Sequence, residues 1–86
     1  MSTAEERPKL INAEPLANKQ IKLFYENGEV KVFSVKEWIE KYPIFAHLKD
    51  EENFRNLKVR SPYVAFDEKT DFSPEVLYDK SEMFYA

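Results

Sequence analysis

The stretch "FYENGEVKVFSVKEWI", residues 24–39, decides the fold, because the spacing of its apolar residues changes partway along it. Ile21, Leu23 and Tyr25 alternate before the turn and Val30 and Val32 after it, which is the two-residue period of a β-strand. Beyond Phe33 apolar residues recur three and four positions apart, the period of one helix face, at Val35, Trp38, Ile39 and Tyr42. Asn27-Gly28 interrupts the alternation and is typical of a two-residue type I′ turn, in which both residues need a positive φ. The stretch therefore predicts a β-hairpin that leads into a short helix.

A two-residue turn would fix which side chains share a face of the hairpin. It would place Tyr25 opposite Val30 and Leu23 opposite Val32, so that these side chains form one apolar face. The other face would carry two aromatic and two basic side chains, namely Phe24, Phe33, Lys22 and Lys31. Aromatic side chains beside charges are typical of protein interfaces, so this second set is the candidate protein interface. The alternative is that the helix around Trp38 covers it.

The junction between the hairpin and the helix carries a predicted capping box. Ser34 stands three residues before Glu37, so its hydroxyl could accept a hydrogen bond from the Glu37 amide while the Glu37 carboxylate reaches back. Phe33 and Trp38 occupy the two positions of a hydrophobic staple around that cap. Pro43 disfavours helical geometry in the residue before it and should end the helix.

Weaker patterns predict the remaining elements. A strand is expected in "KLINAEPL", and it should end near Glu14 because Pro15 follows. Two further strands are expected in "NLKVR" and "YVAF". Short helical turns are expected after the caps Asp50 and Ser73.

These elements together predict an α+β fold. It has a small antiparallel sheet in β-β-β-α-β-β order with short helical turns, and helices on one face. Residues 1–8 are expected to form a disordered leader, 9–79 a single α+β domain, and 80–86 a C-terminal tail. The tail should fray unless Met83, Phe84 and Tyr85 dock.

Composition narrows the classes of function. The 86 residues include no cysteine, which excludes disulfides, thiolate metal sites and cysteine nucleophiles and favours an intracellular compartment. No apolar run approaches the ~20 residues that span a bilayer, so a cytoplasmic protein is expected. The net charge of −3 argues against general binding to nucleic-acid backbones. Arg55, Lys58 and Arg60 form the candidate nucleic-acid patch, for which a solvated strand face is the favoured alternative.

Candidate catalytic residues are few. His47 is the only histidine, and because a catalytic base needs a nucleophile and an orienting group, a structural role is favoured for it. Asp67, Glu68 and Asp71 lack the length and central glycine of an EF-hand calcium loop. Gly28 is the only glycine, so no glycine-rich loop can cradle a phosphate. No enzyme activity, cofactor or metal is predicted; an enzyme would require His47 and a carboxylate to converge in a pocket.

Three longer segments resemble the bacterial domain-of-unknown-function 2442 family. They are "AEPLANKQIKLFYENGEVKVFSVKEWI" (13–39), "PIFAHLKDEENFRNLKV" (43–59) and "YVAFDEKTDFSPEVLY" (63–78). The shared features are the Asn-Gly hairpin, a P-x-F-x-x-L-K-D-x-x-x-F block and a closing D-x-S-P-E-x-L-Y block. In this order they cover about residues 9–79. Phe66 stands where members often have tryptophan.

The resemblance implies a compact α+β domain that occurs alone or fused to a helix-turn-helix DNA-binding domain. It also implies, for some members, a small partner protein encoded alongside, in arrangements that look like toxin–antitoxin pairs. It implies no catalytic residue. The expected function is therefore a non-enzymatic protein-interaction module, in one form an antitoxin-like partner of a small toxin. The alternative is a nucleic-acid-binding or regulatory domain that uses the basic patch.

Overall fold

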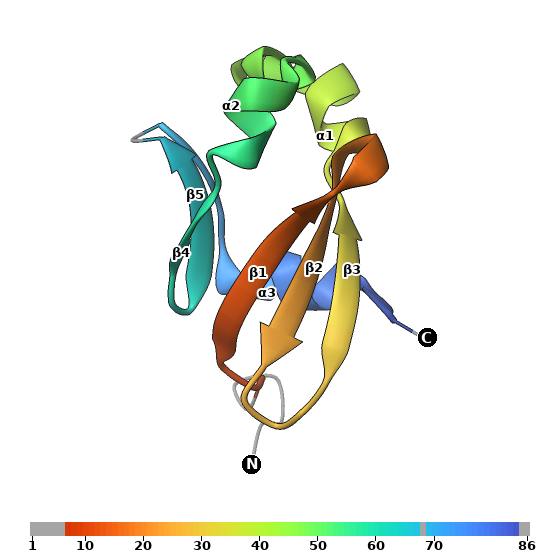
Figure 1. Cartoon of the computed structure of the whole chain (residues 1–86), viewed down its shortest axis with the longest axis vertical. Helices are drawn as coiled ribbons and strands as arrows, with labels where there is room; N and C mark the ends of the chain where they lie inside the picture. Colours follow the sequence, from red (N-terminus) through yellow and green to blue (C-terminus); the bar gives the residue numbers. More distant parts are fainter. Residues whose placement is uncertain (1–6, 68, 85–86) are drawn as a thin grey trace.

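The structure is a computed structural model and describes residues 7–67 and 69–84. Within these residues seven strands form two antiparallel sheets (Figure 1). The four-stranded sheet has the order β1 (Leu10–Leu16), β2 (Gln20–Tyr25), β3 (Val30–Ser34) and β7 (Glu82–Met83). The three-stranded sheet has the order β4 (Lys58–Arg60), β5 (Tyr63–Asp67) and β6 (Thr70–Phe72). The helices are α1 (Lys36–Lys41), α2 (Glu51–Arg55) and α3 (Pro74–Asp79), with 3₁₀ turns η2 (Ala17–Lys19) and η3 (Pro43–Lys49).

The predicted α+β class and its antiparallel pairing are confirmed. The structure goes beyond the prediction in two respects, because the strands divide over two sheets and β6 and β7 add to the expected set. Most of the predicted leader, residues 1–8, lies outside the described residues, which begin at Arg7.

The hairpin of β2 and β3 closes with a three-residue loop, so the predicted two-residue turn is wrong. The Tyr25 N–H donates to the Glu29 carbonyl at 3.0 Å, and the Gly28 N–H donates to the Tyr25 carbonyl at 3.0 Å. Gly28 has a φ of +92°, whereas the φ of Asn27 is not positive. This pattern is a type I turn followed by a left-handed glycine, which is the next most common hairpin loop after the two-residue turns.

The extra loop residue shifts β3 by one position, which exchanges the two faces of the strand. Phe24 now pairs with Val30, and both side chains point away from the core. Phe33 and Lys31 point into the core, where they are 1% and 8% exposed. The four residues of the candidate protein interface therefore do not share a face, and that prediction is wrong for Phe33 and Lys31.

Consecutive positive φ values occur instead between β1 and β2, at Asn18 and Lys19. The Lys19 ammonium donates to Glu51 at 2.7 Å and lies 5.2 Å from the ring centroid of Phe54. The Lys19 carbonyl accepts a hydrogen bond from the Val35 N–H at 2.8 Å. These contacts join the β1–β2 connection to α2 and to the start of α1, and they hold Lys19 in a conformation that few residues other than glycine adopt.

β1 continues through Pro15 to Leu16, although Pro15 was expected to end it near Glu14. Within the described sheet β1 is an edge strand that pairs only with β2. Every second residue of an edge strand turns its N–H away from the neighbouring strand, so a proline at such a position removes no ladder hydrogen bond.

The helix α1 begins without the predicted capping box. Its N-cap is Val35, and no side chain caps it, because Ser34 is still the last residue of β3. The staple contact does form, with the ring centroids of Phe33 and Trp38 6.1 Å apart. The helix ends at Lys41, before Pro43, as predicted.

The predicted caps of the two later helices are confirmed. The Asp50 carboxylate accepts a hydrogen bond from the Glu52 N–H at 2.9 Å at the start of α2. The Ser73 hydroxyl accepts one from the Val76 N–H at 3.3 Å at the start of α3. Both caps satisfy an amide that the first helical turn leaves unpaired.

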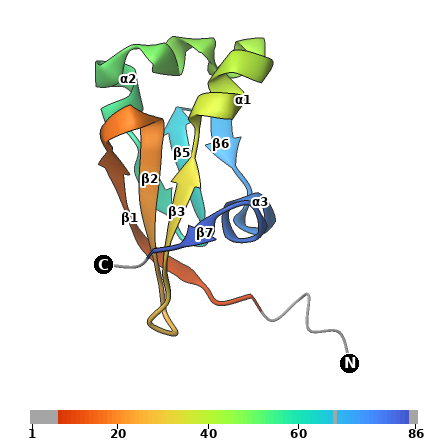
Figure 2. The same ribbon diagram turned by 90° about the vertical axis from the view of Figure 1, so that its right-hand side faces the viewer.

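The core lies between the two sheets, with the segment 36–55 across the end opposite the Gly28 loop (Figure 2). Phe72 of β6 is the central ring. It stacks on Phe45 at 4.8 Å between centroids and meets the edges of Phe33 at 5.0 Å and Trp38 at 5.4 Å. Such rings bury much area per residue, which lets a small chain offset its conformational entropy.

The C-terminal segment docks on β3 in the described residues. The Phe84 N–H donates to the Val30 carbonyl at 2.9 Å, and Met83 pairs with Lys31. The tail was expected to fray unless Met83, Phe84 and Tyr85 dock, and Met83 and Phe84 do dock. Tyr85 lies outside the described residues.

Candidate functional site

The side of the four-stranded sheet that points away from the core carries a stripe of apolar side chains. We call it the outer sheet face, defined by Leu16, Lys22, Phe24, Val30, Val32 and Phe84. The polar residues on the same side of the sheet surround this stripe, and they are Asn12, Glu14, Gln20, Ser34 and Glu82. Side chains of directly paired residues in antiparallel strands point to the same side, so the strand register brings them together. Phe84 is 38% exposed, and the other residues that define the face are half-buried.

Lys22 lies in the middle of the outer sheet face between two rings. Its ammonium is 4.3 Å from the ring centroid of Phe84 and 5.5 Å from that of Phe24. A cation over an aromatic face at an exposed site contributes about 0.5–1 kcal/mol. Lys22 and Phe24 are thus the two members of the predicted interface that the structure places on this face.

Lys31 and Phe33 belong to the core side of the same sheet. The Lys31 ammonium donates to the Tyr78 carbonyl at 2.6 Å and lies 3.8 Å from the centroid of the Tyr78 ring. A charge-assisted hydrogen bond and an aromatic face together offset the cost of taking the ammonium out of water. Lys31 therefore attaches α3 to the sheet, and Phe33 packs against Trp38 and Phe72 in the core.

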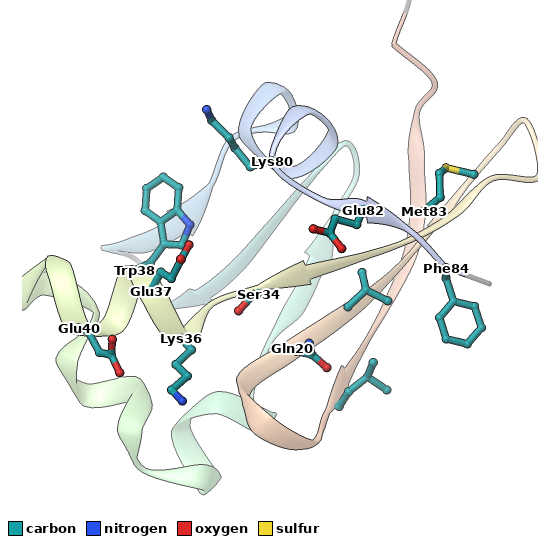
Figure 3. Close-up of a pocket in the computed structure, with 12 residues that line it drawn as sticks. Gln20, Ser34, Lys36, Glu37, Trp38, Glu40, Lys80, Glu82, Met83 and Phe84 are labelled. Atoms are coloured by element: carbon teal, nitrogen blue, oxygen red, sulfur yellow. The ribbon is translucent and has the colours of Figure 1, made fainter. Parts of the chain in front are cut away.

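A groove of about 830 Å³ opens at the α1 end of the outer sheet face (Figure 3). Trp38 lies at one end of the groove, and Phe84 lies at the other. Its charged lining consists of Glu37, Glu40, Glu82, Lys36 and Lys80. At the hairpin end, a more apolar hollow is lined by Phe24, Val30, Met83 and Phe84 among others. The outer sheet face is therefore more apolar at its hairpin end and more charged at its α1 end.

The residues of the candidate nucleic-acid patch lie on two elements. Arg55 is in α2, where its Nε is 3.2 Å from a carboxylate oxygen of Glu51. Lys58 and Arg60 are both exposed on β4 and share one side of that strand. A hollow of about 420 Å³ beside them is also lined by an aspartate from each of β5 and β6. These carboxylates lower the positive potential that a phosphate backbone would meet.

His47 meets a carboxylate at a shallow hollow, which is the arrangement that an enzyme would require. Its Nε2 lies 3.1 Å from an oxygen of Asp67 and 3.4 Å from the hydroxyl of Thr70. Both contacts use the same ring nitrogen, whereas a relay from a carboxylate to a nucleophile uses both nitrogens. Thr70 is 1% exposed, so its hydroxyl is poorly placed to meet a substrate. Glu68, the third acid of this loop, lies outside the described residues.

A polar cluster ties the hairpin loop to α3. The Tyr78 hydroxyl donates to the Glu29 carboxylate at 2.7 Å, which lowers the pKa of Glu29 and raises the pKa of Tyr78. Arg7 donates two hydrogen bonds to Asp79, at 3.0 and 2.6 Å, and lowers the pKa of that carboxyl. Burial raises the pKa of Tyr25, whose ring meets the Tyr78 ring edge-on at 5.2 Å. The cluster fixes the hairpin end of the outer sheet face.

Sequence reasoning missed four residues of the outer sheet face, namely Leu16, Val30, Val32 and Phe84. The predicted two-residue turn places Val30 and Val32 on the same face as Leu23 and Tyr25, and Phe84 belongs to the predicted C-terminal tail. A signal for the valines was present, because Phe33 must face the core to act as the staple partner of Trp38. The alternation of β3 then turns both valines outward.

In comparisons with known proteins, no family model, curated protein or solved structure matches the chain. The resemblance to the domain-of-unknown-function 2442 family stays a prediction. Within residues 7–67 and 69–84, no helix has the length and apolar character to cross a bilayer. The same residues contain no group of three or more histidine or acidic side chains placed to hold a metal ion.

Proposed function

We propose that this chain is a non-enzymatic protein-interaction module that binds its partner through the outer sheet face. The observation that carries this proposal is the apolar stripe of that face, which no other element covers within the described residues. An antiparallel sheet with one face on the core usually presents polar residues on the other face. Apolar and aromatic residues rimmed by charges are instead typical of a protein-binding surface.

The size of the expected effect follows from the aromatic residues. Phe24 and Phe84 flank Lys22 and are the largest side chains of the outer sheet face. Burying an aromatic ring contributes about 1.5–3 kcal/mol, and truncation of a central interface residue commonly costs about 2 kcal/mol or more. Loss of the Phe24 ring should therefore weaken binding by about tenfold or more.

The experiment is co-expression with the product of the neighbouring gene, followed by co-purification and calorimetry. Phe24→Ser should lower the affinity by about tenfold or more, because it removes a ring from the stripe. Ile44→Ser is the matched control, since Ile44 is 54% exposed in η3, away from this sheet. Thermal melts establish that both variants fold. Equal affinity of Phe24→Ser and the unchanged chain would contradict binding through this face.

The antitoxin-like form of the function is supported only by the family resemblance. In that form the neighbouring small protein slows growth, and co-expression of this chain restores it. Absence of rescue would remove the antitoxin form and leave the interaction module to be tested by other partners.

A nucleic-acid-binding or regulatory domain is the second candidate. It is favoured by the exposure of Lys58 and Arg60 on one side of β4, and it is opposed by the aspartates beside them. Salt-dependent retardation of DNA or RNA would support this function, because phosphate contacts release counterions. Unchanged mobility at low salt would exclude it.

A further inference from the structure

The extent of the outer sheet face limits what can bind to it. Four strands spaced about 4.8 Å apart and five residues rising about 3.3 Å each give a surface of about 15 by 17 Å. Its area of about 250 Å² is well below the ~800 Å² that each partner contributes to a stable interface. A second copy packed on this face alone is therefore disfavoured. An α-helix about 10 Å across and three turns long matches the surface.

An extended segment fits the face less well than a helix does. Strand addition takes place at a sheet edge, here the free edge of β1 or of β7, and would leave the outer sheet face uncovered. An open sheet face is buried by an element laid over it, and a helix is the common choice. The partner element is therefore expected to lie across the sheet without joining it.

The charges around the groove indicate the character of that helix. Three carboxylates line it, from Glu37, Glu40 and Glu82, against two ammonium groups, from Lys36 and Lys80. Within the described residues, none of the three carboxylates has an ion-pair partner. In Figure 3 the Glu82 carboxylate lies beside β3, whereas the Lys80 side chain extends away from β3. Lys22, the ammonium in the middle of the face, lies 4.3 Å from the centroid of the Phe84 ring.

We infer that the partner presents a single amphipathic helix with basic flanks, and this inference rests on the proposed function. Its apolar side chains pack on Phe24, Val30 and Phe84 at the hairpin end. Its lysine or arginine side chains lie near Glu37 and Glu82 at the α1 end. Charges at the rim of an interface chiefly set the choice of partner and the rate of association, so opposite charge on the helix should select it.

The probes are two synthetic amphipathic helices of 14 residues with the same leucine positions, one flanked by lysines and the other by glutamates. Each is titrated into the full chain and followed by calorimetry and by backbone amide NMR shifts. We expect the basic peptide to bind, with shifts at Lys22, Phe24 and Val32. The double variant Glu37→Gln/Glu82→Gln should weaken it by about two- to thirtyfold, the combined contribution of two rim ion pairs. The acidic peptide should bind at least tenfold more weakly than the basic one.

The outcomes separate this inference from the proposed function. Equal binding of both peptides on the outer sheet face would overturn the charge preference and still support an interaction surface there. Shifts confined to the region of Ile44, or no binding of either peptide, would overturn the helix inference. The proposed function is decided separately, by whether Phe24→Ser weakens the natural complex. Glu40→Gln, at the outer end of the groove, gives a milder variant if the double variant fails to fold.

Discussion

Gly28→Ala isolates the backbone cost of the hairpin loop. Gly28 has a φ of +92°, and a Cβ built on it meets no other atom within 4 Å. The substitution therefore adds no clash, and its whole cost is the left-handed conformation, about 1–2 kcal/mol for a residue with a Cβ. In a domain of this size 1 kcal/mol shifts the melting temperature by about 4–8 °C. The variant should therefore melt about 4–16 °C lower than the unchanged chain.

The assay is thermal unfolding followed by circular dichroism, with urea unfolding for the free energy. Gly28→Asn is the control, because asparagine tolerates positive φ better than other residues with a Cβ, and it should recover about half of the loss or more. Both variants should keep the same urea m-value, since the folded and unfolded surfaces barely change. A melting temperature of Gly28→Ala within a degree of the unchanged chain would refute the three-residue loop with a left-handed glycine.

Two further predictions concern acid stability and helix caps. The folded-state pKa of Glu29 is lowered, chiefly by the Tyr78 hydroxyl, so its contribution to stability is present above the unfolded pKa of 4.5 and is lost as the pH falls through the lower folded value. The urea concentration at the unfolding midpoint should thus decrease as the pH is lowered below about 5, and it should decrease less steeply in Tyr78→Phe. The same pH dependence in both proteins would contradict the contact between Tyr78 and Glu29. Ser73→Ala should cost about 0.5–2 kcal/mol and Ser34→Ala much less, because only Ser73 caps a helix. Equal midpoints for the two serine variants would speak against this difference.

The class of fold could be predicted from the sequence because its strongest signals are local. The change of period near Phe33, the stop at Pro43 and the cap at Ser73 each depend on a few neighbouring residues. The strand β6 has three residues and β7 has two, which is too short for a periodic pattern to be recognised. β7 also pairs with a strand about fifty residues earlier, a contact that no local pattern contains.

The register of the hairpin illustrates a conflict that the sequence itself contains. Asn27-Gly28 fits a two-residue turn, which turns Phe33 outward and Lys31 with it. The staple with Trp38 requires Phe33 to face the core, and the three-residue loop satisfies it by burying Lys31 as well. Burying an ammonium is unfavourable unless it has a hydrogen-bond acceptor, and here that acceptor is the Tyr78 carbonyl. The contact between Lys31 and Tyr78 joins residues 47 positions apart, so local sequence patterns do not predict it.

The candidate site was predicted in part for the same reason. Lys22 and Phe24 lie on β2, whose faces do not depend on the loop length, and they are on the outer sheet face as expected. The other half of the face depends on the register of β3 and on the docking of Phe84. Both are properties of the folded chain.

Because β7 lies near the end of the described chain, the parts of the outer sheet face are expected to form in a definite order during folding. β2 and β3 pair through a loop of three residues, whereas β7 can add only after α3 has brought the chain back beside β3. Short loops close sooner than long ones, so the ring of Phe84 is among the last groups to arrive. Until it does, the ammonium of Lys22 lacks one of the two rings that flank it in the native protein. The surface that a partner would recognise is therefore completed last, and a chain that has not finished folding lacks one of the two large rings of that surface.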